Sequence, residues 1–77
     1  MIEPAEIRNR IQGALPGATV EVRDMTGTSD HYEVKVIAGQ FAGLNSVERH
    51  RLVYSAVLDV IGGRLHALSV STLTPGE

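Results

Sequence analysis

The sequence contains no cysteine and no tryptophan, and only 4% of its residues are aromatic. The missing thiols exclude disulfide bridges and every cysteine-based catalytic mechanism. With so few rings, the core must consist mainly of Val, Ile, Leu and Ala. No apolar run approaches the roughly 20 residues of a membrane span, and the first residues lack the pattern of a secretory signal. We therefore expect a cytoplasmic protein that does not enter a membrane.

A strong charge imbalance is also missing. The net charge is −2 and the pI about 5.9 over 77 residues, which is a weak electrostatic basis for binding nucleic acid. The length predicts one domain, residues 1–77, and the 43% hydrophobic content is ordinary for a globular chain.

The hydrophobic pattern predicts the element order α–β–β–α–β. The first helix, 3–15, has an apolar stripe at positions 7, 11 and 15 and stops at Pro16-Gly17. Two alternating runs, 18–23 and 31–37, flank a polar turn and predict an antiparallel hairpin. Residues 38–45 form a connection in which Phe41 plugs one end of the core.

A second helix follows, and Asn45 or Ser46 can cap it, with Glu48 near the third position of a capping box. Gly62-Gly63 should end this helix, and the third strand should span 65–73. Arginines 49 and 51 and Asp59 should point outward. The stripe that we expect to be buried contains these residues: Val47, Val53, Ala56, Val57, Val60 and Ile61.

A right-handed crossover should leave the third strand parallel to the second. We therefore expect an α+β fold, in which both helices cover one face of a mixed three-stranded sheet and the other face is partly open to water.

Histidines 31 and 66 open the second and third strands. For either residue alone, a structural histidine at a strand end is the common case. If the strands are parallel neighbours, however, the two imidazoles lie at one edge of the sheet, where they could bind a metal. Two ligands do not close such a site, so a partner would have to supply the rest.

The segment Arg49-His50-Arg51 has two interpretations: a solvated basic face, or a docking surface for an acidic partner or phosphate. Three consecutive residues fan around the helix, so His50 should be turned partly inward or lie along its flank. No nucleophile elbow, P-loop or dinucleotide fingerprint is present, and an enzyme is therefore not expected.

Taken together, several segments resemble the BolA-like family. They are Asp30-His31-Tyr32-Glu33-Val34, Phe41-Ala42-Gly43, the run from Arg49 to Tyr54, Leu65-His66-Ala67-Leu68, and Thr72-Leu73-Thr74-Pro75. The resemblance covers nearly the whole chain. It implies a fold similar to class II KH domains and a partnership with a monothiol glutaredoxin around a shared [2Fe–2S] cluster.

In that family the histidine of the Leu-His-Ala-Leu segment is a cluster ligand, which implies this role for His66. A second ligand comes from the hairpin loop, where His31 is the candidate and Asp30 the alternative. Because a chain without thiols cannot hold a cluster alone, the thiolates would come from the glutaredoxin and its glutathione. We expect the isolated chain to be a monomer or weak homodimer without a bound cofactor.

The resemblance also implies a second hypothesis, a nucleic-acid-binding transcriptional regulator of stress response and morphology. Its basic patch would contain Arg23, Arg49, Arg51 and Arg64, with His50 beside them. The glycines read Gly39-x-x-x-Gly43, however, and not the G-x-x-G loop of KH domains. A third hypothesis is an adaptor domain whose histidines are only structural.

Overall fold

The computed structural model describes residues 3–25, 31–60 and 67–76. The element order confirms the predicted α–β–β–α–β pattern, with a short 3-10 helix added between the second strand and the second helix. The elements are α1 (Pro4–Ala14), β1 (Thr19–Asp24), β2 (His31–Ile37), η1 (Gly39–Phe41), α2 (Ser46–Val57) and β3 (Ala67–Leu73).

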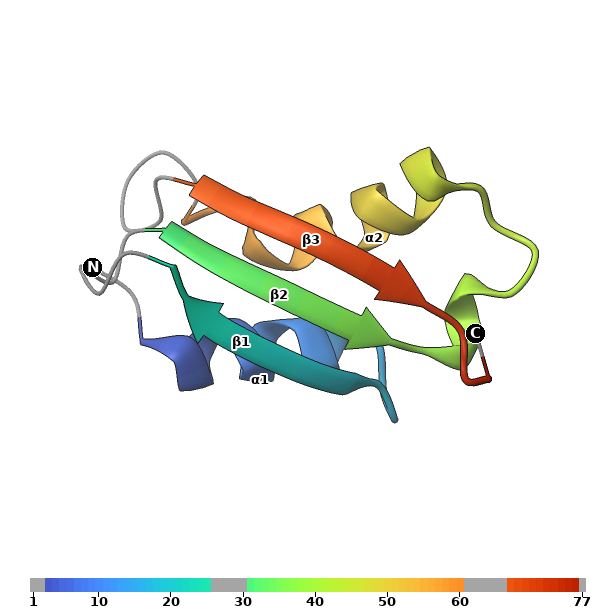
Figure 1. Ribbon diagram of the computed structural model, residues 1–77, viewed down its shortest axis with the longest axis horizontal. Coiled ribbons are helices and arrows are strands. Elements are labelled where there is room, and N and C mark those ends of the chain that lie inside the picture. The colour runs from blue at the N-terminus through green and yellow to red at the C-terminus, as the bar shows by residue number, and fades with distance from the viewer. Residues whose placement is uncertain (1–2, 26–30, 61–66, 77) are drawn as a thin grey trace.

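The three strands form one mixed sheet in the order β1–β2–β3. In the antiparallel pair β1–β2, Val22 lies opposite Val34, and in the parallel pair β2–β3, His31 lies opposite Ala67. Both helices cover the same face of the sheet (Figure 1). The α+β fold and the parallel crossover expected from the sequence are therefore confirmed.

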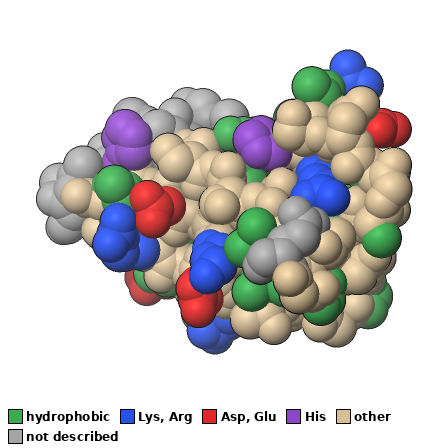
Figure 2. Space-filling view, turned by 45° about the vertical axis from the view of Figure 1, so that its right-hand side comes forward, with side chains coloured by type: hydrophobic (Ala, Val, Ile, Leu, Met, Phe, Trp, Pro, Cys, Tyr) green, Lys and Arg blue, Asp and Glu red, His purple; other side chains and the backbone are tan. Residues whose placement is uncertain are grey.

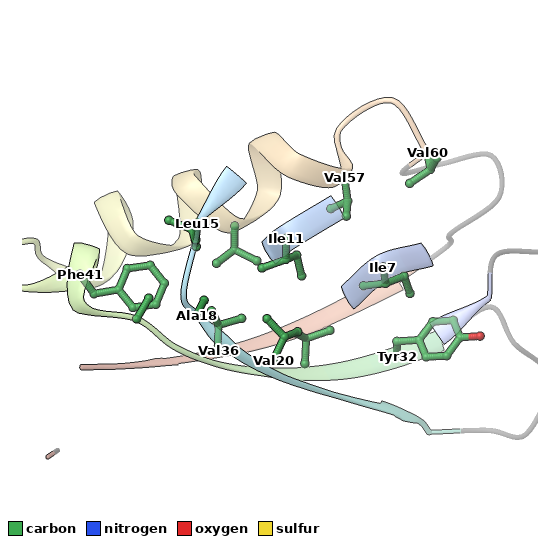
Figure 3. Close-up of a cluster of buried hydrophobic side chains, with 13 residues drawn as sticks. Ile7, Ile11, Leu15, Ala18, Val20, Tyr32, Val36, Phe41, Val57 and Val60 are labelled. Carbon is green, nitrogen blue, oxygen red and sulfur yellow. The ribbon is translucent and has the colours of Figure 1, made fainter. Parts of the chain in front are cut away.

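The core lies between the helices and the inner face of the sheet. Its central strand is β2, where Tyr32, Val34 and Val36 are each 0% exposed. Figure 3 shows Phe41 at one end of the core and Tyr32 at the other. Phe41 is also 0% exposed, which confirms that it closes one end of the core.

The predicted stripe packs against the core: Ile7 and Ile11 of α1 are buried, and so is Leu15, the C-cap residue that follows the helix. On its other side, Arg10 forms ion pairs with Glu6 at 3.1 Å and with Asp59, beyond the end of α2, at 2.8 Å. The hydrogen bonds to Asp59 and Glu6 raise the pKa of the Arg10 guanidinium above its ordinary value. These contacts link the two helices at the surface.

The helix α2 begins with the predicted capping box. The Asn45 side chain accepts a hydrogen bond from the Glu48 backbone N–H at 2.9 Å, and the Glu48 carboxylate accepts one from the Asn45 N–H at 3.1 Å. The two residues are three positions apart in the first turn, which is why this motif can be recognised from sequence alone.

The predicted buried stripe of α2 was wrong at its start. Val53, Val57 and Val60 are buried and Ala56 is partly buried, but Val47 is 57% exposed. Figure 1 shows that the first turns of α2 extend past the free edge of β3, so no sheet lies beneath them. The position of Ile61 falls outside the described residues.

The end of α2 also differs from the prediction. The regular helix ends at Val57, whereas Gly62-Gly63 was expected to stop it. The Val60 N–H bonds to the Val57 carbonyl at 3.0 Å, in a tighter turn than that of an α-helix. The Val60 side chain is only 4% exposed, so the tighter turn after α2 places it in the core. The two glycines lie outside the described residues.

The outer face of the sheet is open to solvent, as expected. Glu21 and Lys35 are exposed on neighbouring strands, and Arg23 forms an ion pair with Glu33 at 3.3 Å directly across β1 and β2. None of the described helices has the length and apolar character needed to cross a membrane.

Candidate functional site

The first residues of β2 and β3 lie side by side, as the parallel arrangement predicted. His31 is exposed at the start of β2, and its carbonyl accepts a hydrogen bond from the Met25 N–H at 2.8 Å. Its Cα partner is Ala67, the residue that directly follows His66 in the chain. His66 and Asp30 themselves lie outside the described residues, so the approach of two imidazoles stays a prediction.

The described donor atoms do not build a metal centre by themselves. Within residues 3–25, 31–60 and 67–76, no three His, Asp or Glu side chains are placed to hold one ion. His31 offers one accessible imidazole, a suitable ligand for an iron–sulfur cluster if thiolates supply the other positions. The donor set therefore fits a shared site and not a site built by the described residues alone.

Arg49 on α2 does not point into solvent, contrary to expectation. Its guanidinium carbon lies 5.9 Å from the centre of the Phe41 ring, and its Nε donates to the Leu44 carbonyl at 3.0 Å. The side chain is half-buried. Arg49 thus fastens the start of α2 to the connection before it, and its charge is less available to a ligand than the sequence suggested.

His50 lies on the flank of α2, as predicted, and it is half-buried beside Tyr54. The two ring centres are 6.3 Å apart, with the planes tilted by 58°. The Tyr54 hydroxyl donates to the Leu68 carbonyl of β3 at 2.7 Å. This flank of α2 therefore faces the free edge of β3.

The sequence patterns predict no role for Tyr54. The available signal was its spacing of four residues from His50, which places the two rings on one side of a helix. The bond from Tyr54 to Leu68 was not predictable, because it depends on where the edge strand lies relative to α2.

The predicted basic patch is divided in the structure. Arg51 is exposed on α2, whereas Arg23 lies on the outer face of the sheet, where it is paired with Glu33. Charges of both signs appear on the face shown in Figure 2, where histidine side chains lie apart from one another. Arg64 lies outside the described residues. Of the predicted patch residues on α2, Arg51 is thus the exposed arginine.

A depression of about 360 Å³ on the outer face of the sheet is lined by equal numbers of positive and negative side chains. Its walls contain Glu21, Val22, Arg23, Glu33 and Lys35, which carry two formal charges of each sign. Because these charges offset one another, the depression is poorly suited to concentrate phosphate or another polyanion.

These features define a small α+β domain with an exposed histidine where two parallel strands begin and a histidine–tyrosine pair beside an edge strand. The description of the matching family model is "BolA-like protein", and it covers residues 11–77. The chain belongs to the BolA-like family.

Similar proteins align with nearly the whole of this chain. Human BolA-like protein 1 is 34% identical over 80 residues, a match that covers 95% of this chain and 58% of the human protein. The solved structure of BolA1 from Arabidopsis thaliana aligns with a TM-score of 0.86 at 33% identity, and covers 99% of this chain and 98% of that chain. The chain spans little more than half the length of the human relative.

A relative from Vibrio cholerae has a functional name, DNA-binding transcriptional regulator BolA. It is 41% identical over 51 residues, which covers 66% of this chain and 48% of that protein. The names of these relatives describe BolA-like proteins and a regulator, and none of the three names an enzyme.

Proposed function

We propose that this protein is a non-enzymatic partner of a monothiol glutaredoxin and shares a [2Fe–2S] cluster with it, in iron–sulfur trafficking or iron sensing. The observation that carries the proposal is the register of β2 and β3. It pairs His31, an exposed residue, with the residue that follows His66. Membership of the BolA-like family supports the same partner.

In this proposal the chain supplies imidazoles and the partner supplies thiolates. The cluster, when bound, provides iron that accepts both kinds of ligand. His66 is the first ligand and His31 the second, with Asp30 as the alternative. The glutaredoxin and its glutathione provide the sulfur ligands, which this chain lacks.

The test mixes the protein with a cluster-loaded monothiol glutaredoxin and records visible circular dichroism. We expect a changed cluster spectrum that is lost in His66→Ala and altered or weakened in His31→Ala. His50→Ala is the matched control, because this histidine lies on α2 beside Tyr54, and it should keep the wild-type spectrum. An unchanged spectrum on mixing, or equal effects of all three substitutions, would reject the ligand assignment.

Acidification provides a second readout. Imidazole binds iron in its neutral form, so protons compete with iron for the ring nitrogen. The mixed-cluster spectrum should therefore weaken as the pH falls from about 7.5 to about 5.5, more steeply than the spectrum of the glutaredoxin alone. Identical pH profiles for the two samples would contradict histidine ligation.

The adaptor hypothesis, in which the histidines are only structural, gives the opposite pattern. His66→Ala would then lower the free energy of unfolding and leave binding to the glutaredoxin and its spectrum unchanged. Chemical denaturation of the variants separates this outcome from the loss of a ligand.

A second candidate function is nucleic-acid binding, favoured by the name of the Vibrio cholerae relative and by the exposure of Arg51. The net charge of −2 and the inward position of Arg49 oppose it. The test is a salt titration of affinity for duplex DNA. A steep salt dependence that falls in Arg51→Ala, but not in Arg8→Ala on α1, would support DNA binding. Absence of binding near physiological salt would remove it.

A further inference from the structure

The free edge of β3 and the adjoining flank of α2 form a surface that the proposed cluster site does not use. Within the described residues it contains Val47, His50 and Tyr54 of α2 together with Val70 and Thr72 of β3. We call it the α2–β3 edge surface.

The direction of the backbone groups follows from one hydrogen bond. The Ala38 N–H bonds to the Leu73 carbonyl at 2.9 Å, so Leu73 presents its backbone groups to the β2 side. In a parallel pair, alternate residues point to opposite sides. Residues 69 and 71 therefore also bond toward β2, whereas residues 68, 70 and 72 direct their N–H and C=O groups to the free edge.

One of these edge groups is already occupied. The Tyr54 hydroxyl donates to the Leu68 carbonyl at 2.7 Å, which agrees with the outward direction of that carbonyl. Within the described residues, Tyr54 bonds to this edge at Leu68 and not at Val70 or Thr72. The outward N–H and C=O groups of Val70 and Thr72 are therefore available to an added strand. A row of such groups is the usual template for strand addition.

The side chains beside this edge are incompletely covered. Val70 on β3 is half-buried, whereas Val34, its Cα partner on β2, is 0% exposed. Val47 is 57% exposed on the part of α2 that extends past the edge of β3 (Figure 1). A strand added next to β3 would place alternate side chains over Val47 and Tyr54 and remove apolar area from water.

This flank presents a cation, the Arg51 side chain. Arg51 is exposed one helical turn after Val47, and the half-buried His50 lies next to it. The nearby carboxylate of Glu48 accepts a hydrogen bond from the Asn45 N–H within the capping box. An acidic residue at one end of the added strand would therefore meet a cation.

From the edge, its apolar border and this charge, we propose that the α2–β3 edge surface binds an extended acidic–apolar peptide segment of a partner protein by strand addition to β3. The segment alternates apolar residues toward α2 with polar residues toward the outer face, and it carries Asp or Glu near Arg51. The proposal needs no cluster and no histidine ligand, so it stands or falls separately from the function proposed above.

The test uses the intact protein and a phage library of nine-residue peptides. We expect enrichment of alternating apolar–polar sequences with an acidic end, and slower exchange of the Val70 and Thr72 amides when the synthetic peptide is bound. Methylating the peptide amides that face β3 should abolish binding, whereas methylating the alternate amides should preserve it. Failure to enrich such peptides, or equal effects of the two methylation patterns, would overturn the proposal.

Paired substitutions locate the surface. Val47→Glu should weaken peptide binding by about tenfold, since it places a carboxylate in the apolar contact and beside an acidic ligand. Leu52→Glu is the matched control, because Leu52 is 36% exposed on another side of the same helix. Glu is acceptable in the first turn of a helix, so Val47→Glu should fold normally. Equal weakening by both substitutions would place the peptide elsewhere.

Charge reversal at Arg51 gives an independent check. Arg51→Glu should weaken the acidic peptide by about fivefold and strengthen a peptide with Lys in place of its acidic residue. Binding of a single-stranded oligonucleotide that protects the same amides, without enrichment of any peptide, would overturn the peptide assignment in favour of nucleic acid. Dimerisation that protects these amides in the free protein would instead assign the edge to a second copy.

Discussion

The two outer strands of the sheet are covered very differently. Strand β1 lies against α1, whose Ile7 and Ile11 are buried, and of its own two valines Val20 is only 8% exposed and Val22 is half-buried. Strand β3 lies beside a helix that partly extends past it, and its Val70 is half-buried. Both strands are edges of the sheet, but less of the apolar face of β3 is covered, and its outward backbone groups lie beside the exposed Val47 of α2.

The same contrast distinguishes the two helices. The first helix begins without a side-chain cap, whereas the second has a complete capping box. The helix α2, whose first turns lie beyond the sheet, therefore has the more complete hydrogen-bonded cap at its start. Local hydrogen bonds can thus hold the first turn of α2 where tertiary packing contributes little.

The largest expected effect is at the closed end of the core. Phe41→Ala should lower the free energy of unfolding by about 3–5 kcal/mol, because a fully buried ring is removed and leaves a cavity. For a domain of this size that loss approaches the total stability. Leu58→Ala, at a residue 69% exposed, should change stability by less than about 0.5 kcal/mol. Urea denaturation of both variants measures the difference, and similar losses would contradict the described core.

A matched pair of valines tests the unequal covering of the strands. Val34→Ala should cost about 2 kcal/mol, and Val70→Ala at its Cα partner about half as much, since more of Val70 remains in contact with water. The same denaturation experiment applies. If Val70→Ala costs as much as Val34→Ala, then β3 is covered as completely as β2 and the contrast fails.

The caps of the two helices form another pair. Asn45→Ala removes the acceptor for the Glu48 N–H and should cost about 1 kcal/mol. Glu3→Ala, at a helix start whose side chain makes no capping hydrogen bond, should cost only a few tenths of that. Thermal unfolding followed by circular dichroism compares them, and a larger effect at Glu3 would show that the capping box contributes little.

The smallest expected effect is at the edge strand. Tyr54→Phe keeps the ring beside His50 and removes the hydrogen bond to the Leu68 carbonyl, which should cost about 0.5–1 kcal/mol. Tyr32→Phe serves as the comparison at the other tyrosine of the chain, which is fully buried. Amide exchange should become faster in β3 for Tyr54→Phe and not for Tyr32→Phe. Unchanged exchange in β3 would show that Tyr54 does not hold this edge.

Short-range patterns in the sequence were sufficient for most of the fold. The period-two runs predicted β1 and β2, the spacing of four predicted the buried face of α1, and Asn45 with Glu48 predicted the capping box. Each of these patterns depends on residues that are only two to four positions apart in the sequence. The family resemblance added the expected cluster ligands, and of these His31 is described at the predicted strand start.

Tertiary contacts decided the remaining features. Val47 is exposed because the first turns of α2 pass beyond the edge of β3. The hydrophobic pattern of a helix does not tell where the sheet lies beneath it. Arg49 bends back because Phe41 and the Leu44 carbonyl lie within reach.

The sequence by itself therefore determined which segments form helices and strands, and which face of most of them is apolar. Only the tertiary structure decided that β3 is the less covered of the two edge strands, that Tyr54 reaches Leu68, and that Arg23, Arg49 and Arg51 do not form one patch. The physical reason is range: propensity and capping act between near neighbours in the chain, whereas coverage and side-chain direction depend on segments that meet only after folding.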